Sequence, residues 1–121
     1  GSNKIMLDAY NANPSSMYAA IKFFEEFSEK NKILILGDMF ELGKDSNTYH
    51  QEIAEYCRNI KNTKIFLVGE LFCNTTRFKE FNYSLNIENL ISKGDLSKIK
   101  NSYLFIKGSR GIKLEKVIDN I

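Results

Sequence analysis

Polar side chains that could bind a ligand follow four short apolar runs in this chain. They occupy residues 8–14, 37–43, 69–70 and 107–111. Carboxylates, amides, a phenol, a hydroxyl and cations are all represented, and such groups bind sugars, phosphates and carboxylates. Because ligands of open α/β sheets bind outside the carboxyl ends of the strands, these segments are the first candidates for a site.

The segment 8–14 combines Asp8 with Asn11 and Asn13, and Pro14 marks a helix start. A carboxylate such as Asp8 can accept hydrogen bonds from a ribose diol. The N–H groups at a helix N-terminus attract phosphate or carboxylate. Asn13 and Pro14 also fit the N-cap and first helical positions. The spacing is therefore equally consistent with a turn in which Asn11 and Asn13 only shape the chain and cap the helix.

The segment 107–111 places Lys107 and Arg110 on either side of Gly108 and Ser109. Two cations, a hydroxyl and a flexible glycine at a helix start suit a carboxylate or a phosphate. A solvated basic turn would have the same composition. The residues alone leave both interpretations open.

Asp38, Glu41 and His50 are further candidates with less specific surroundings. Asp38 and Glu41 lie between two glycines and could orient an ammonium group or cap the following helix. His50 is the only histidine, beside a helix start, and we interpret it as a surface or supporting residue rather than a catalytic one. Tyr10 and the nine phenylalanines are expected mostly in the core.

The apolar pattern predicts the elements that must position these residues. Strands are expected at 4–7, 33–36, 65–68, 81–85 and 103–106, and the second and third are apolar throughout, as buried parallel strands are. Helices are expected from Pro14 to about 30–31, at 71–79, and at 87–100 with a break near Gly94. Two further helices are expected to bury one face each, with Tyr49, Ile53, Tyr56 or Cys57 and Ile60 on the first and Leu114, Val117, Ile118 and Ile121 on the last. The alternation predicts a Rossmann-like three-layer α/β domain with a mostly parallel sheet and helices on both faces.

Composition limits the class of protein. The chain has 121 residues, 43% hydrophobic and 26% charged, which suits one globular domain. A net charge of +2 with scattered lysines gives no reason to expect nucleic acid or an anionic membrane as partner. No apolar stretch reaches the roughly 20 residues of a membrane span, and no signal peptide is visible. Gly1-Ser2 is interpreted as a cloning remnant, which leaves 3–121 as the domain.

Several catalytic motifs are missing from the sequence. It has no P-loop and no dinucleotide fingerprint, and one histidine cannot build a hydrolytic triad. Cys57 and Cys73 form no CxxC or Cys/His cluster, so no metal site is expected, and Cys57 is expected as a buried thiol. From the residues alone, the chain is an α/β domain with an anion-binding edge.

Four blocks nevertheless resemble the C-terminal domain of the Mur ligase family. They are DAYNANPSSM at 8–17 followed by Ala19-Ala20, LGDMFELG at 36–43, HQEI at 50–53, and KGSR at 107–110 with Leu114-Glu115 beyond. The blocks occur in the family's order and span nearly the whole chain. The Asn-Ala-Asn-Pro block resembles the branch that joins D-alanyl-D-alanine to UDP-N-acetylmuramoyl-tripeptide, whereas related branches usually carry histidine before the proline.

The resemblance implies a reaction in peptidoglycan synthesis. Such ligases use ATP and Mg²⁺ to convert the tripeptide carboxylate into an acyl phosphate, which the dipeptide amine then attacks. Asp8 and Asn11 would contact the ATP ribose or phosphate, and Asn13 would support that loop. Lys107, Ser109 and Arg110 would hold the dipeptide carboxylate or steady the intermediate. Tyr10, Asp38, Glu41 and His50 would have supporting roles.

The resemblance also implies partners. The N-terminal and central domains of the same chain would hold the UDP-sugar, ATP and the metal, so this domain would be inactive alone. We expect a cytoplasmic monomer that binds no nucleic acid, membrane or metal. The alternatives are a standalone binding module and a receiver-type regulatory domain. A receiver needs paired acids after its first strand, where this chain has Asp8-Ala9, and an aspartate after its third, where it has Gly69-Glu70.

Overall fold

A computed structural model describes residues 3–121, so the interpretation of Gly1-Ser2 as a cloning remnant lies outside the described residues. Five parallel strands form one sheet in the order β1-β5-β2-β3-β4. They are β1 (Lys4–Asp8), β2 (Lys32–Gly37), β3 (Thr63–Val68), β4 (Asn82–Ser84) and β5 (Tyr103–Lys107). All five predicted strands are present, and the predicted parallel α/β fold is confirmed.

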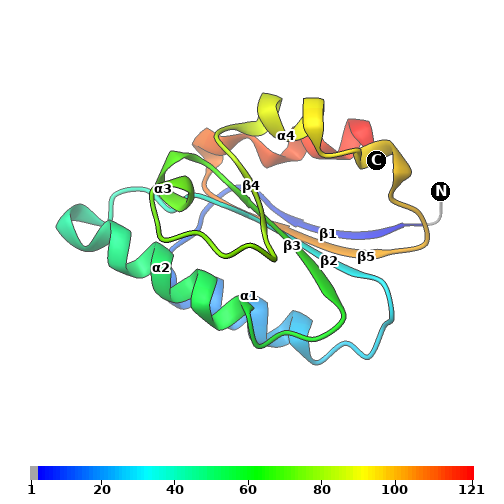
Figure 1. Cartoon of the computed structure of the whole chain (residues 1–121), viewed down its shortest axis with the longest axis horizontal. Helices are drawn as coiled ribbons and strands as arrows, with labels where there is room; N and C mark the ends of the chain where they lie inside the picture. Colours follow the sequence, from blue (N-terminus) through cyan, green and yellow to red (C-terminus); the bar gives the residue numbers. More distant parts are fainter. Residues whose placement is uncertain (1–2) are drawn as a thin grey trace.

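Helical elements cover both faces of the sheet (Figure 1). Helices α1 (Pro14–Glu25) and α2 (Ser46–Cys57) pack on one face, and α4 (Ile87–Lys93) and the 3₁₀ helix η4 (Leu114–Asn120) pack on the other. Each face has its own buried cluster, centred on Phe24 and Ile53 in one case and on Leu90 and Val117 in the other. The short elements are η1 (Gly43–Asp45), α3 (Glu70–Cys73), η2 (Leu96–Lys98) and η3 (Arg110–Ile112).

The strand register brings the polar segments to one edge. Asp8 at the end of β1 is level with Lys107 at the end of β5, and Lys107 is level with Leu36 near the end of β2. Since all strands are parallel, the segments after them emerge together, on the side of the sheet where α3 lies in Figure 1. This edge is where the sequence analysis placed a ligand site.

Helix α1 ends earlier than predicted. It begins with a capping box between Asn13 and Ser16 and with Pro14 in its first turn, as expected, but it stops at Glu25 rather than at 30–31. The buried ammonium of Lys32 donates to the carbonyl oxygens of Phe24 (3.0 Å), Glu25 (3.3 Å) and Phe27 (3.0 Å). The Phe24 carbonyl also accepts from Phe27 N–H at 3.1 Å, and the ammonium adds a donor for all three carbonyls, so a residue of the next strand stabilises the end of α1.

Two other helix predictions were wrong in detail. The stretch predicted as helical at 71–79 is helical only at Glu70–Cys73, because Thr75 turns the chain by bonding back to the Phe72 carbonyl through both its N–H (3.1 Å) and its hydroxyl (2.6 Å). The last helix has 3₁₀ geometry, whose repeat of three buries Leu114 and Val117 and leaves Ile118 37% exposed. The predicted break near Gly94 is confirmed, between α4 and η2.

None of the helices within residues 3–121 is long and apolar enough to cross a membrane. Cys57 and Cys73 are buried and free, and burial raises the pKa of the Cys57 thiol to about 12. Both thiols are therefore protonated packing groups at neutral pH, as predicted for Cys57.

Candidate functional site

The two polar loops that flank β1 and β5 are joined by an ion pair. The Lys107 ammonium donates to Asp8 Oδ2 at 2.6 Å and to the Asn11 carbonyl oxygen at 3.1 Å. The Lys107 side chain is only 4% exposed, whereas that of Asp8 is 46% exposed. The pair therefore presents a carboxylate to solvent and keeps its cation underneath.

The backbone after β5 is held from both sides. Gly108 N–H donates to the Asp8 carbonyl at 3.1 Å, and Ser109 N–H donates to the Asp38 carbonyl at 3.2 Å. This is possible because β5 lies between β1 and β2 in the sheet. The segment 107–109 is thus a fixed element rather than a mobile basic turn.

Tyr10 and Arg110 form a second contact between the same loops. The Arg110 guanidinium carbon lies 4.0 Å from the centre of the Tyr10 ring, a cation–π distance. Tyr10 is 70% exposed, so its expected place in the core is wrong. Phe23 (54%) and Phe40 (43%) are exposed as well, whereas Phe24 and Phe72 are fully buried as expected. An aromatic ring and a guanidinium therefore stand at the outer surface of the edge, where a ligand could reach them.

The two asparagines of the loop at 8–14 have different hydrogen-bond partners. Asn13 Oδ1 accepts from Ser16 N–H at 2.9 Å, while Asn13 N–H donates to Ser16 Oγ at 3.1 Å. The capping alternative is therefore confirmed for Asn13, which fixes the start of the 12-residue helix α1 at the ligand edge. Asn11 is exposed, and its backbone carbonyl is the group bound by Lys107.

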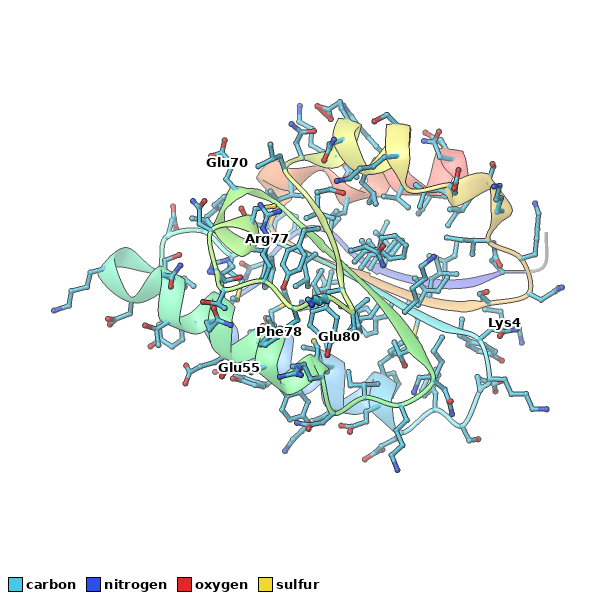
Figure 2. All side chains as sticks on the ribbon, viewed as in Figure 1. Lys4, Glu55, Glu70, Arg77, Phe78 and Glu80 are labelled. Atoms are coloured by element: carbon cyan, nitrogen blue, oxygen red, sulfur yellow. The ribbon has the colours of Figure 1, made fainter. Side chains whose placement is uncertain are left out.

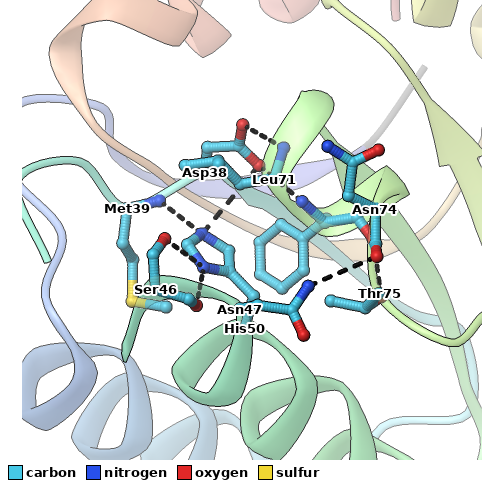
Figure 3. Close-up of polar contacts among 9 residues, drawn as sticks. Asp38, Met39, Ser46, Asn47, His50, Leu71, Asn74 and Thr75 are labelled. Atoms are coloured by element: carbon cyan, nitrogen blue, oxygen red, sulfur yellow. Dashed lines mark hydrogen bonds and ion pairs between the residues drawn. The ribbon is translucent and has the colours of Figure 1, made fainter. Parts of the chain in front are cut away.

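Asp38 is a buried helix cap. Its two carboxylate oxygens accept from the N–H groups of Leu71 (2.9 Å) and Phe72 (3.0 Å) at the start of α3 (Figure 3). It therefore caps α3 and not α2, the following helix. Burial raises the pKa of the Asp38 carboxyl, and the two N–H bonds offset only part of that rise. Glu41 is exposed in a turn with φ of 64°, so the two acids do not share a site.

His50 is fully buried beneath Asp38 rather than at the surface. Its Nε2 accepts from Met39 N–H at 3.0 Å, and its Nδ1 lies 2.7 Å from the Ser46 carbonyl (Figure 3). These partners assign the proton of a neutral ring to Nδ1. Burial lowers the pKa of His50, which keeps Nε2 available as the acceptor. The expectation of a surface residue is wrong, and its geometry is that of a support for the loop at 38–43.

The predicted buried face of α2 is confirmed at Ile53 and Cys57 but not at its first residue. Tyr49 was placed on that face but is 37% exposed, and His50 is buried instead with Ile53, Ala54 and Cys57. The polar character of His50 concealed its burial in the sequence. The buried hydrogen bond to Met39 is what makes an imidazole acceptable there.

A hollow of about 400 Å³ lies at the same edge and was not predicted from the sequence. Its lining residues are Asp38, Phe40, Glu70, Leu71, Leu85, Asn86 and Ile112. Phe40 and Leu85 are 43% and 54% exposed there, and Glu70 projects outward from α3 (Figure 2). Leu85 and Ile112 follow β4 and β5, so the strand-end rule could have found them, but apolar residues were not counted as candidates.

The charged groups at this edge are an ion pair and a guanidinium. Asp8 already accepts a hydrogen bond from Lys107, and Arg110 adds a second cation nearby. Within 3–121, no three His, Cys, Asp or Glu side chains gather where they could hold a metal ion. The geometry defines an open parallel α/β domain whose strand-end edge carries a partly exposed ion pair and an exposed guanidinium.

Comparison with known proteins gives the family. A model for "Mur ligase, glutamate ligase domain" matches residues 1–96. The chain belongs to the Mur ligase family, as the sequence blocks predicted. It is 37% identical to the UDP-N-acetylmuramoyl-tripeptide--D-alanyl-D-alanine ligase of Rickettsia prowazekii, covering 97% of this chain and 27% of that protein. It is 39% identical to the ligase of the same name from Buchnera aphidicola subsp. Acyrthosiphon pisum, covering 98% of this chain and 27% of that protein.

Solved structures of Mur ligases contain a domain with this fold. The crystal structure of MurF ligase from Thermotoga maritima in complex with ADP superposes with a TM-score of 0.78 at 23% identity, over 95% of this chain and 27% of that one. The chain therefore spans about a quarter of the length of the relatives it matches.

Proposed function

We propose that this chain is the acceptor-binding and closing C-terminal domain of the ATP-dependent ligase that joins D-alanyl-D-alanine to UDP-N-acetylmuramoyl-tripeptide in peptidoglycan synthesis. The names of its relatives support this activity. The observation that carries the proposal is that the loops at 8–14 and 107–110 meet at one edge, joined by Lys107 and Asp8 at 2.6 Å. Both loops belong to the blocks that resemble this branch of the family.

Each loop has a proposed ligand. Asp8 and Asn11, both exposed, contact the ATP ribose or phosphate, and Asn13 holds the start of α1 in place for them. Ser109 and Arg110 bind the carboxylate of the dipeptide or steady the intermediate. Lys107 was expected beside them and contributes its positive charge from below the surface.

The supporting residues shape these loops. Tyr10 stacks on Arg110, and Asp38 holds Ser109 through its carbonyl. His50 fixes the backbone after Asp38, and Glu41 forms the exposed turn of the same loop.

The proposed reaction has two steps. The tripeptide carboxylate attacks the γ-phosphorus of ATP, which forms an acyl phosphate and releases ADP. The neutral amine of the dipeptide then attacks the acyl carbon, loses a proton, and expels phosphate as the amide forms. ATP and Mg²⁺ supply the activation and are held mainly by the remaining domains of the ligase. This domain orients the nucleotide and the amine, and completes the site only on closure.

The proposal also covers the partners of this chain and its place in the cell. The remaining domains of the ligase are the partners of this chain, and the chain alone does not catalyse ligation. The ligase works in the cytoplasm as a monomer. Neither nucleic acid nor membrane is a partner.

An NMR titration of the 121-residue chain with D-alanyl-D-alanine tests the acceptor site, with L-alanyl-L-alanine as the control. We expect shifts at the amides of 107–111, larger for the D,D dipeptide. A ligation assay on the longer ligase, with Ser109→Ala, tests the same residue in the assembled site. Equal shifts for both dipeptides, together with unchanged turnover of Ser109→Ala, would overturn the acceptor assignment.

A further inference from the structure

Lys107 is the least exposed of the candidate site residues that carry a cation. Its side chain is 4% exposed, and its ammonium faces Asp8 Oδ2 and the Asn11 carbonyl rather than the surface. Two of its three N–H donors are already bound inside the chain, and so little of the side chain is exposed that a ligand has almost no access to the third. Lys107 is therefore badly placed to bind a ligand directly.

We propose that Lys107 is a positioning residue that acts on the nucleotide half of the site, through Asp8 and Asn11, although its own strand leads into the dipeptide half. This assignment rests on the proposed ligase function. It differs from the expectation that Lys107 binds the dipeptide or the intermediate.

Two contacts carry the assignment. The 2.6 Å bond to Oδ2 restrains the Asp8 carboxylate, whose side chain is still 46% exposed and so within reach of a ligand. The 3.1 Å bond to the Asn11 carbonyl holds the loop where it turns from β1 toward α1. One ammonium thus orders both residues proposed to contact the nucleotide, and it does so from the neighbouring strand.

The dipeptide half has its own support. Ser109 is held by the Asp38 carbonyl through its backbone N–H at 3.2 Å, a contact that does not involve the Lys107 side chain. Asp38 is in turn fixed by α3 and lies beside His50. Removing the Lys107 ammonium should therefore disturb 8–13 more than 109–111.

Steady-state kinetics of the longer ligase distinguish these roles. For Lys107→Met, we expect KM for ATP to rise about tenfold or more while KM for D-alanyl-D-alanine stays within about twofold. Lys22→Met is the matched control, since it removes one positive charge from an exposed position of α1. A rise confined to KM for the dipeptide would overturn the assignment.

A double-variant cycle provides a second, independent readout. If Lys107 acts through Asp8, Lys107→Met should change KM for ATP by less than about twofold when Asp8→Asn is already present. Independent roles would make the two effects multiply. The double variant also removes both charges of the pair. If the single Lys107→Met variant fails to fold, the double variant and Lys107→Gln replace it in the KM measurements.

The 121-residue chain gives a readout that needs no activity. In a ¹H–¹⁵N spectrum of Lys107→Met we expect the largest amide shifts at 8–13, while those of 38–43 remain near wild type. Large shifts at 109–111 with none at 8–13 would contradict the assignment. A wild-type ligase that does not ligate the dipeptide would instead reject the proposed function, and this spectrum would still test the contact itself.

Discussion

Replacing His50 by phenylalanine tests whether the buried imidazole supports the loop at 38–43. The perturbation removes the acceptor of Met39 N–H, and Met39 is itself fully buried. An unpaired buried N–H costs about 1–3 kcal/mol, and the lost bond from Nδ1 to the Ser46 carbonyl adds about 0.5–1.5 kcal/mol. The edge-to-face contact with Phe72, at 4.7 Å between ring centres, can persist. We expect unfolding free energy to fall by about 2–4 kcal/mol at pH 8.

The loss should depend on pH. Burial lowers the pKa of His50 below its ordinary 6.5, so the unfolded chain binds a proton at a higher pH than the folded chain does. The contribution of His50 is therefore fully present above pH 6.5 and is lost as pH falls through the folded-state pKa. The wild-type curve should fall by at most about 1.4 kcal/mol per pH unit from this group. The difference between wild type and His50→Phe should narrow toward pH 5.

Urea unfolding followed by circular dichroism at pH 8, 7, 6 and 5 measures this difference, since the chain has no tryptophan. His50 is the only histidine, which simplifies the comparison. Asp38 lies 4.0 Å from His50, and its pKa is raised. Its contribution to stability is therefore lost as pH rises, which is opposite to the effect of His50. Asp38 is present in every variant. His50→Gln should recover part of the stability without the pH dependence, and Tyr49→Phe is the control on α2. Parallel curves for wild type and His50→Phe would refute the reasoning.

Three further predictions concern stability. Lys32→Met should destabilise the chain by about 1–3 kcal/mol in urea unfolding, because the part-buried carbonyls of Glu25 and Phe27 lose the ammonium as donor; an unchanged midpoint would contradict that role. Asn13→Ala should cost about 1 kcal/mol through loss of the α1 cap, measured by thermal unfolding, and a cost near zero would mean that Pro14 alone sets the helix start. Gly69→Ala should be far more damaging than Gly43→Ala, since a Cβ at Gly69 would clash with the buried Asp38 carboxylate whereas nothing lies within 4 Å at Gly43; equal melting temperatures would contradict this.

The strands were predictable because their signal is local. Residues 33–36 and 65–68 are apolar throughout, and both strands are buried at the centre of the sheet. The start of α1 was equally legible, since Asn13 and Pro14 specify a cap by residue type. The end of α1 was not, because it depends on Lys32, which reaches it only in the folded sheet.

The candidate site was predictable in location but not in internal arrangement. The strand-end rule brought the loops at 8–14 and 107–111 to one edge, and the structure joins them. Nothing in the sequence showed that Lys107 would be buried, or that Asp38 would cap α3 across 33 residues of chain. Both contacts require knowing that β5 lies between β1 and β2 and that β2 lies beside β3.

The site separates the residues that position from those that can touch a ligand. Lys107, Asp38 and His50 are buried. Each of their side chains bonds to a backbone group of a loop or helix at this edge. Asn11 and Arg110 are exposed at the edge. A domain that meets its ligands only on closure gains from this division, because exposed groups already held in place lose little further freedom when the ligand arrives. In the proposed ligase, substitutions among the buried residues should therefore weaken ligand binding through disorder of the loops, while substitutions of the exposed residues should leave the loops ordered and remove a contact.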